Sequence, residues 1–240
     1  MHRWDPWRGC KKYSEGCLNC YIHRGDVKRG VKTENVMKTK DFLKPIRKDK
    51  KGSYIMKSGL VYMCFSSDFL IEDADLWRLD CWKMIKQRSD CTFLFLTKRI
   101  DRFIQIVPDD WGSGYENVVV CCTIEDQQSA DHRLSLFLKL PIIHKIITAQ
   151  PLIEKINIEK YLHNIEEVVV GGESGVLGRP LDYDWVLNLR QQCLRRNTNF
   201  TFRQCGSHFV KDGKHYKIPV KELIKQAKLA NIDFQVNQNQ

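Results

Sequence analysis

Three cysteines stand close together near the start of the chain. Cys10, Cys17 and Cys20 fall within eleven residues, in a C-x6-C-x2-C pattern on a polar, glycine-containing stretch. Three thiolates on one short loop can converge on a metal or a cluster without bringing distant elements together. The spacing leaves three interpretations open, namely an iron–sulfur cluster, a zinc site and unliganded thiols.

The two metal interpretations predict different chemistry. A [4Fe–4S] cluster usually has four cysteine ligands, so three protein thiolates leave one iron open. An open iron suits radical S-adenosylmethionine (SAM) chemistry, in which the methionine end of SAM chelates that iron and an electron breaks the S–C5′ bond. In the zinc interpretation, His23 completes a closed Cys3His tetrahedron.

Polar residues also follow six strand-like runs of the sequence. They are Ser66, Ser67 and Asp68; Thr97, Lys98 and Arg99; Glu125 and Asp126; Gln150 and Pro151; Gly171 to Gly175; and Arg203 and Gln204. In parallel α/β folds, the carboxyl ends of the strands open on one side, where ligands bind. We therefore expect these residues to form the functional face.

Two of these strand ends suit a nucleoside-sulfonium cofactor. In VVVGGESG, Gly171 and Gly172 let the backbone approach a ligand, and Glu173 can bind an ammonium group. A tight strand-to-helix turn explains the same glycines without a ligand. In CFSSDF, Ser67 and Asp68 can bind ribose hydroxyls or the same amino group. A structural zinc protein needs neither the Gly-Gly-Glu segment nor the Ser67–Asp68 pair.

The elements that position these residues alternate along the chain. Apolar, β-branched runs predict strands, and amphipathic stretches between them predict helices. The strands are expected at 60–65, 91–96, 117–124, 144–149, 166–172 and 200–204, and the helices at 73–88, 100–106, 127–138, 158–162, 184–195 and 220–230. Strand–helix–strand repeats favour parallel pairing. We expect a partial (βα)6-type parallel barrel with an N-terminal cysteine loop and a short C-terminal helical tail; an open doubly wound sheet is the rival.

We expect a single domain with four parts. Residues 1–26 form the cysteine loop, 27–59 a basic excursion, 60–210 the βα repeats and 211–240 the tail.

The 240 residues carry a formal net charge of +10, which favours polyanionic partners such as nucleic acid or phosphorylated molecules. A solvated, flexible face explains the charge equally well. No apolar run approaches membrane-spanning length and no signal-peptide pattern opens the chain, so we expect a cytoplasmic protein without membrane contact.

Several motifs together resemble a known family. They are WDPWRGCKKYSEGCLNCY, VYMCFSSDFLIED, FLFLTKRIDRF, NVVVCCTIEDQQSADHRL, QPLIEKI, VVVGGESGVLGRP and DWVLNLRQQCLRRNTNFTFRQCG, over roughly residues 4–210. The chain resembles a phage and prophage three-Cys-motif family of unknown function, which itself looks like a divergent branch of the radical SAM proteins. The resemblance implies a partial TIM-type barrel, a cluster on Cys10, Cys17 and Cys20, and SAM at the rim.

The chain departs from that family at four positions. The family usually has Asn at Asp5, Glu at Gln150, Lys at Arg203 and often Trp at Cys205. In addition, the cysteine spacing differs from the commoner C-x3-C-x2-C of radical SAM enzymes, and the Gly-Gly-Glu of Gly171–Glu173 comes late in the chain. These departures leave open whether the chain turns substrate over or only binds it.

The leading hypothesis is a radical SAM enzyme with a [4Fe–4S] cluster on the three cysteines. SAM would be bound by Ser67, Asp68, Gly171, Gly172, Glu173 and Arg179, while Lys98, Glu125, Arg203 and Gln204, again with Arg179, are candidates for substrate contact or proton handling. A nucleotide or nucleic acid is the expected substrate. An external electron donor and a companion protein are expected partners. The alternative is a zinc-stabilised nucleic-acid-binding phage protein without catalysis. A hydrolase or transferase using Glu125 and Lys98 leaves the cysteines unexplained.

Overall fold

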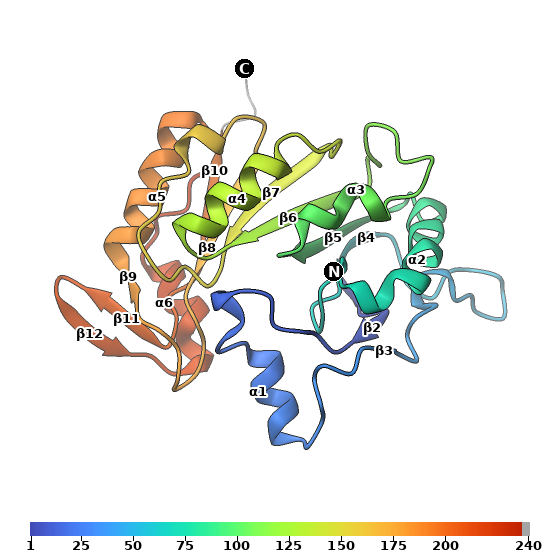
Figure 1. Ribbon diagram of the computed structural model, residues 1–240, viewed down its shortest axis with the longest axis horizontal. Helices are drawn as coiled ribbons and strands as arrows, with labels where there is room; N and C mark the ends of the chain where they lie inside the picture. The colour runs from blue at the N-terminus through green and yellow to red at the C-terminus, as the bar shows by residue number, and fades with distance from the viewer. Residues whose placement is uncertain (237–240) are drawn as a thin grey trace. The chain divides into compact units, whose positions relative to one another are not determined.

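The computed structural model describes residues 1–236 and has a mixed α/β fold (Figure 1). Its main sheet is a seven-stranded half-barrel sheet with the strand order β1-β4-β5-β6-β7-β8-β10. These strands are β1 (His2–Trp4), β4 (Gly59–Met63), β5 (Cys91–Thr97), β6 (Val118–Ile124), β7 (His144–Ala149), β8 (Glu167–Gly171) and β10 (Asn199–Gln204). The expected α/β class is therefore confirmed in its coarse form, and the six strands expected from the sequence all form.

The chain divides into two compact units. Unit 1 comprises residues 1–12, 22–121 and 139–144, and unit 2 comprises 13–21, 122–138 and 145–240. The division runs through β6 between Cys121 and Cys122, and it also passes through the cysteine loop. Cys10 thus belongs to unit 1, whereas Cys17 and Cys20 belong to unit 2.

In unit 1, parallel strands carry helices on the chain between them. β1 pairs with β4, and β4 pairs with β5, both in parallel. Helix α2 (Asp75–Gln87) follows β4, and the short α3 (Phe103–Ile106) follows β5. Aromatic side chains fill the core of this unit, including Trp4, Trp7, Phe69, Trp82, Phe93 and Phe95. Burying such large rings is the main source of stability here.

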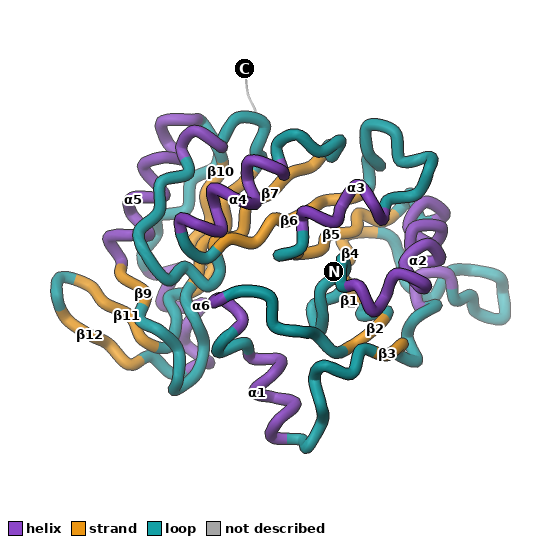
Figure 2. Tube along the Cα trace, in the orientation of Figure 1, coloured by secondary structure: helices purple, strands orange, loops and turns teal. Residues whose placement is uncertain are grey.

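The region between β1 and β4 contains little regular structure, as its lack of periodicity predicts. It holds helix α1 (Tyr21–Lys28) and a two-stranded pairing of β2 (Trp7–Arg8), which precedes α1, with β3 (Met37–Lys38), which follows it. Most of this stretch appears as loop in Figure 2. Trp7 anchors it, because its ring is fully buried and stacks on Phe69 with 5.4 Å between ring centroids.

Unit 2 repeats the strand–helix alternation. β7, β8 and β10 pair in parallel, with helix α4 (Gln127–Phe137) preceding β7 and helix α5 (Tyr183–Arg196) preceding β10. Helix α4 starts with a capping box, since the Asp126 carboxylate accepts from the Ser129 amide at 2.7 Å and Ser129 Oγ accepts from the Asp126 amide at 3.1 Å. Helix α5 ends at Asn197, which adopts a left-handed conformation.

The tail forms more structure than the expected helix. That helix is α6 (Leu223–Leu229), preceded by a 3-10 turn. Before it, β11 (His208–Lys211) and β12 (Lys214–Lys217) form an antiparallel hairpin that joins β9 (Leu181–Asp182) in a small sheet. The last four residues of the predicted tail lie outside the described residues. No helix within residues 1–236 is both long and apolar enough to cross a bilayer.

Candidate functional site

In unit 1, the backbone around Cys10 is fixed on both sides. The Cys10 amide donates to the Thr33 carbonyl at 2.8 Å, and Ser67 Oγ donates to the carbonyl of Gly9. Gly9 has φ +93°, and a Cβ atom there would lie 2.4 Å from the Asn35 carbonyl oxygen. Only glycine fits this position, because the turn before Cys10 is both left-handed and closely packed.

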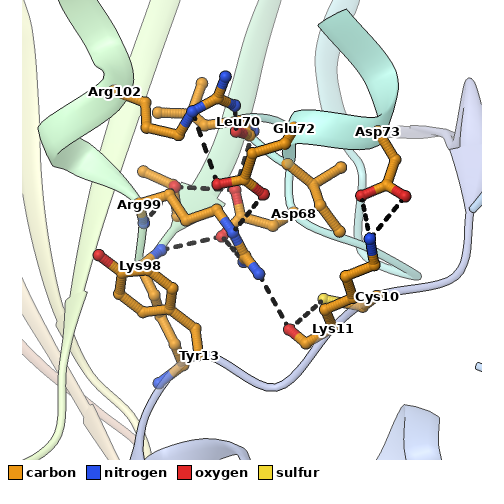
Figure 3. Close-up of polar contacts among 12 residues, drawn as sticks. Cys10, Lys11, Tyr13, Asp68, Leu70, Glu72, Asp73, Lys98, Arg99 and Arg102 are labelled. Carbon is orange, nitrogen blue, oxygen red and sulfur yellow. Dashed lines mark hydrogen bonds and ion pairs between the residues drawn. The ribbon is translucent and has the colours of Figure 1, made fainter. Parts of the chain in front are cut away.

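Asp68 organises the residues at the ends of β4 and β5 (Figure 3). Its Oδ1 accepts from Thr97 Oγ1 at 2.8 Å and from the Leu70 amide at 2.9 Å, and its Oδ2 accepts from the Lys98 amide at 3.0 Å. Arg99 Nη1 adds a fourth contact at 3.3 Å. A carboxylate offers about four acceptor positions, so those of Asp68 are filled by the protein.

Arg99 connects Asp68 to the cysteine loop. Its Nη2 donates to the Lys11 carbonyl at 3.0 Å, and the guanidinium is buried. Burial alone would lower the pKa of Arg99, but the nearby Asp68, Cys10 and Glu72 outweigh it and raise the pKa above its ordinary value. A fixed positive charge therefore lies beside Cys10, as Figure 3 shows. Such a charge favours the thiolate form of a cysteine.

In unit 2, Glu125 holds the residues that precede Cys17. This carboxylate is fully buried at the end of β6 and accepts from Arg133 Nη1 at 2.6 Å and from Ser14 Oγ. Ser14 is the N-cap of the 3-10 helix Glu15–Cys17, and its carbonyl accepts from the Cys17 amide at 2.8 Å. The ion pair between Arg133 on α4 and Glu125 after β6 thus fixes Ser14 and, through Ser14, the position of Cys17.

Glu173, after β8, holds the same loop on its other side. Its Oε2 accepts from Asn19 Nδ2 at 2.9 Å and from the Arg179 amide at 2.7 Å. Arg179 pairs with the carboxylate of Glu173 and also donates from Nη2 to the Glu15 carbonyl at 2.9 Å. Burial would raise the pKa of Glu173, but the hydrogen bonds from Arg179 and Asn19 outweigh it and hold the pKa below its ordinary 4.5. The carboxylate therefore stays charged and holds the loop through Asn19 and Arg179.

Cys17 and Cys20 lie one turn apart. The Cys20 amide donates to the Cys17 carbonyl at 3.2 Å, and the Tyr13 amide donates to Cys17 Sγ at 3.5 Å. Cys17 is buried and Cys20 is half-buried. Hydrogen bonds to sulfur are one of the factors that set the potential of an iron–sulfur cluster.

The glycines after β8 have a packing role. A Cβ atom on Gly172 would lie 2.8 Å from Cα of Gly206, and one on Gly171 would lie 2.9 Å from the Gln150 side chain and 3.0 Å from that of Gln204. Gln204 Nε2 also donates to the Gly172 carbonyl at 2.6 Å. The close approach of the segment after β10 thus accounts for Gly172, and the side chains of Gln150 and Gln204 account for Gly171.

The candidate residues therefore fall into two groups. Ser67, Asp68, Glu125, Glu173 and Arg179 hold the cysteine loop, each within its own unit. Arg203 is exposed and Gln204 is half-buried at the end of β10, and Lys98 contributes its amide to Asp68. The sequence placed Arg99 at the expected functional face without giving it a role, and it did not indicate Arg133, Ser14 or Asn19 as supports of the loop. No local signal marks Ser14 for this role, because its side chain makes no capping hydrogen bond and donates to Glu125 instead.

Two further observations concern metal ligands. The structure records all ten cysteines as thiols. Within residues 1–236, no three or more His, Cys, Asp or Glu side chains form a group that could hold a metal ion. His23 lies in α1 in unit 1, where burial lowers its pKa and Glu34 partly offsets that effect. The Cys3His zinc site stays a prediction.

The fold is mixed α/β, and within each unit residues of the cysteine loop bond to residues at strand ends. A family model described as "Protein of unknown function (DUF5131)" matches residues 1–237, so the chain belongs to that family. No curated protein and no solved structure is similar enough to match.

Proposed function

We propose that the chain is a radical SAM enzyme in which Cys10, Cys17 and Cys20 hold a [4Fe–4S] cluster. In this proposal the half-barrel sheet is a divergent form of the partial (βα)6 barrel expected from the sequence, with its cofactor at the carboxyl ends of the strands. A cubane takes one thiolate per iron, so its three sulfur ligands do not have to meet around a single ion.

The observation that carries the proposal is the way the cysteine loop is held. Buried charged residues from four strand ends fix the residues beside the cysteines: Asp68 and Arg99 hold Lys11, Glu125 holds Ser14, and Glu173 with Arg179 holds Asn19 and Glu15. Burying charges is costly unless their partners are well placed. The buried charges around this short polar loop therefore support the interpretation that its thiols must be positioned accurately.

The local chemistry also fits thiolate ligands. Arg99 places a positive charge beside Cys10, and the Tyr13 amide donates to the sulfur of Cys17. When bound, the cluster would supply the electron that splits SAM into methionine and a 5′-deoxyadenosyl radical. Asp68 and Glu173 act here as positioning residues, while Arg203, Gln204 and the side chain of Lys98 remain the candidates for contact with substrate.

Anaerobic purification with iron and sulfide reconstitution tests the proposal. We expect brown protein with about four irons per chain, an EPR signal after reduction, and 5′-deoxyadenosine once SAM is added. Cys17→Ala should abolish all three. Cys193→Ala is the matched control, because this cysteine is buried in α5 away from the loop and should leave the iron content unchanged.

The zinc alternative gives the opposite result. Colourless protein with one zinc per chain, released by His23→Ala, would end the radical SAM proposal. Iron bound equally well by Cys17→Ala would also end it, since the cluster would then lie elsewhere.

A further inference from the structure

The hairpin of β11 and β12 in unit 2 is an exposed basic ribbon (Figure 1, left). Lys211, Lys214, His215, Tyr216 and Lys217 are all exposed. Residues 207–221 contain four lysines and one aspartate, a formal charge of +3 with histidines neutral. In the described part of the chain, no ion pair is recorded for Lys211, Lys214 or Lys217, in contrast to Lys225, which pairs with Glu222 at 3.7 Å.

Two of these lysines face each other. Lys211 and Lys214 occupy directly opposite positions in the antiparallel ladder, next to the Asp212–Gly213 turn. Like charges in opposite positions destabilise a strand pair. Lys211 gains a compensating contact, because its Nζ lies 5.4 Å from the centre of the Tyr183 ring. An anion bound between the two ammonium groups would remove the repulsion.

A second exposed feature is fixed to this hairpin. His208 Nε2 lies 2.9 Å from the carbonyl oxygen of Val176, and His208 Nδ1 lies 3.1 Å from His215 Nε2. A carbonyl only accepts, so Nε2 of His208 carries the hydrogen and its Nδ1 accepts from His215. His208 therefore connects the hairpin to the loop that contains Val176.

That loop presents two apolar side chains to solvent. Val176 is 89% exposed and Leu177 is 70% exposed. The base of the loop is held by the Gly175 amide, which donates to Ser207 Oγ at 2.8 Å, and by the Gly178 amide, which donates to the Gly175 carbonyl at 3.0 Å. These hydrogen bonds hold a small apolar tip beside the basic hairpin, where it is available to a partner.

We propose that this surface binds a nucleic-acid strand. The lysines of the hairpin contact phosphates, the exposed ring of Tyr216 stacks on a base, and the Val176–Leu177 tip inserts beside a base step. Lysine contacts to phosphate supply most of the affinity in such complexes, while aromatic rings and apolar wedges hold bases that leave the stack. The inference rests on the proposed function in one respect, since it names nucleic acid as the substrate class.

Nucleic acid fits this surface better than an anionic membrane does. Membrane-surface segments bury a long apolar face, whereas the exposed apolar side chains recorded here are few and lie on separate segments, Val176 and Leu177 on one loop and Val220 after the hairpin. A narrow two-stranded ribbon also matches the width of a nucleic-acid groove. Along β12, an edge strand of the small sheet, Lys214 and Tyr216 project to one face and His215 and Lys217 to the other, so a nucleic-acid strand that follows this edge meets side chains from both faces.

Fluorescence anisotropy with labelled single-stranded and duplex DNA and RNA tests the proposal. We expect binding of at least one of these oligonucleotides, weakening between about 50 mM and about 200 mM salt. The double variant Lys214→Glu/Lys217→Glu should reduce affinity at least tenfold and lower the salt slope by about 2. Val176→Ser/Leu177→Ser should reduce affinity while leaving the salt slope unchanged.

The control has the same change in charge. Lys139→Glu/Lys155→Glu alters two exposed lysines outside the hairpin and should keep near-wild-type affinity. Equal losses in the control and the hairpin variant would overturn the proposal, as would binding to anionic vesicles but to none of the oligonucleotides. Thermal melting confirms that each variant is folded. Cys17→Ala separates this inference from the cluster, because it should lose iron but keep binding to the oligonucleotide.

Discussion

Arg179 is central at the scale of single residues because its guanidinium links Glu173, which follows β8, to the cysteine loop. It pairs with Glu173 and donates to the Glu15 carbonyl. Glu173 and Asp68 both use their acceptor capacity on the protein itself. In this structure both carboxylates therefore support the loop, Glu173 through Asn19 and Arg179, and Asp68 through Arg99.

Replacing Arg179 changes how the protein responds to acid. The pKa of Glu173 is held below 4.5, so this group adds stability above that pH and loses it as the pH falls through the folded value. In Arg179→Gln, burial dominates and the pKa of Glu173 rises. We expect lower stability at about pH 7 and a smaller further loss at about pH 4, measured as urea midpoints.

Arg195→Gln is the matched control for this prediction. Arg195 pairs with Glu159 at 2.7 Å on the surface, where its side chain is 54% exposed. Exposed pairs contribute little, so the pH dependence of this variant should follow that of the wild type. If Arg179→Gln kept the pH dependence of the wild type, Arg179 would not be the residue that lowers the pKa of Glu173.

The sequence indicated which residues matter at the strand ends but not what they contact. A polar residue after a buried strand marks the carboxyl edge of a parallel sheet, and this pattern identified Ser67, Asp68, Glu125 and Glu173. Their partners are Ser14, Asn19 and Arg99, which are far away in sequence. Pairings of that kind depend on the folded geometry and leave no local signature.

At the scale of elements, the β8 end packs tightly enough to exclude a methyl group. A Cβ atom on Gly172 would lie 2.8 Å from Cα of Gly206, and neither backbone can yield without moving β8 or β10. Gly172→Ala should therefore cost about 1–3 kcal/mol in the free energy of unfolding, measured by urea titration.

Gly25→Ala provides the comparison. This glycine lies inside α1, and its nearest neighbour is the flexible end of Arg29 at 3.4 Å. Alanine is the better helix former, so this variant should be neutral or up to about 1 kcal/mol more stable. A Gly172→Ala protein as stable as Gly25→Ala would contradict the packing role.

Prediction of the elements succeeded where patterns were long and failed where they were short. The six buried strands and the helices α2, α4 and α5 follow from apolar runs and helical periodicity. The hairpin has almost no apolar pattern, because β12 is entirely exposed. Its Asp212–Gly213 turn, with both residues at positive φ, was the signal that could have revealed it. β1 was missed because three residues carry no periodicity.

At the scale of the whole molecule, the loop is supported by side chains from the protein itself. We expect that exposing the reconstituted protein to air bleaches its visible absorption but leaves its far-UV circular dichroism unchanged, because the ion pairs at Asp68, Glu125 and Glu173 do not depend on a cofactor. The two spectra recorded on one sample check this. Loss of both signals together would mean that the cofactor holds the fold.

The contacts of residues 13–21 also have a consequence for biosynthesis. Ser14 and Asn19 are translated more than one hundred positions before their partners Glu125 and Glu173. During that interval the nascent chain carries Cys17 and Cys20 without the anchors that will fix them. In the proposed enzyme, the cluster would therefore be inserted only after Glu173 has been translated and the loop has its anchors.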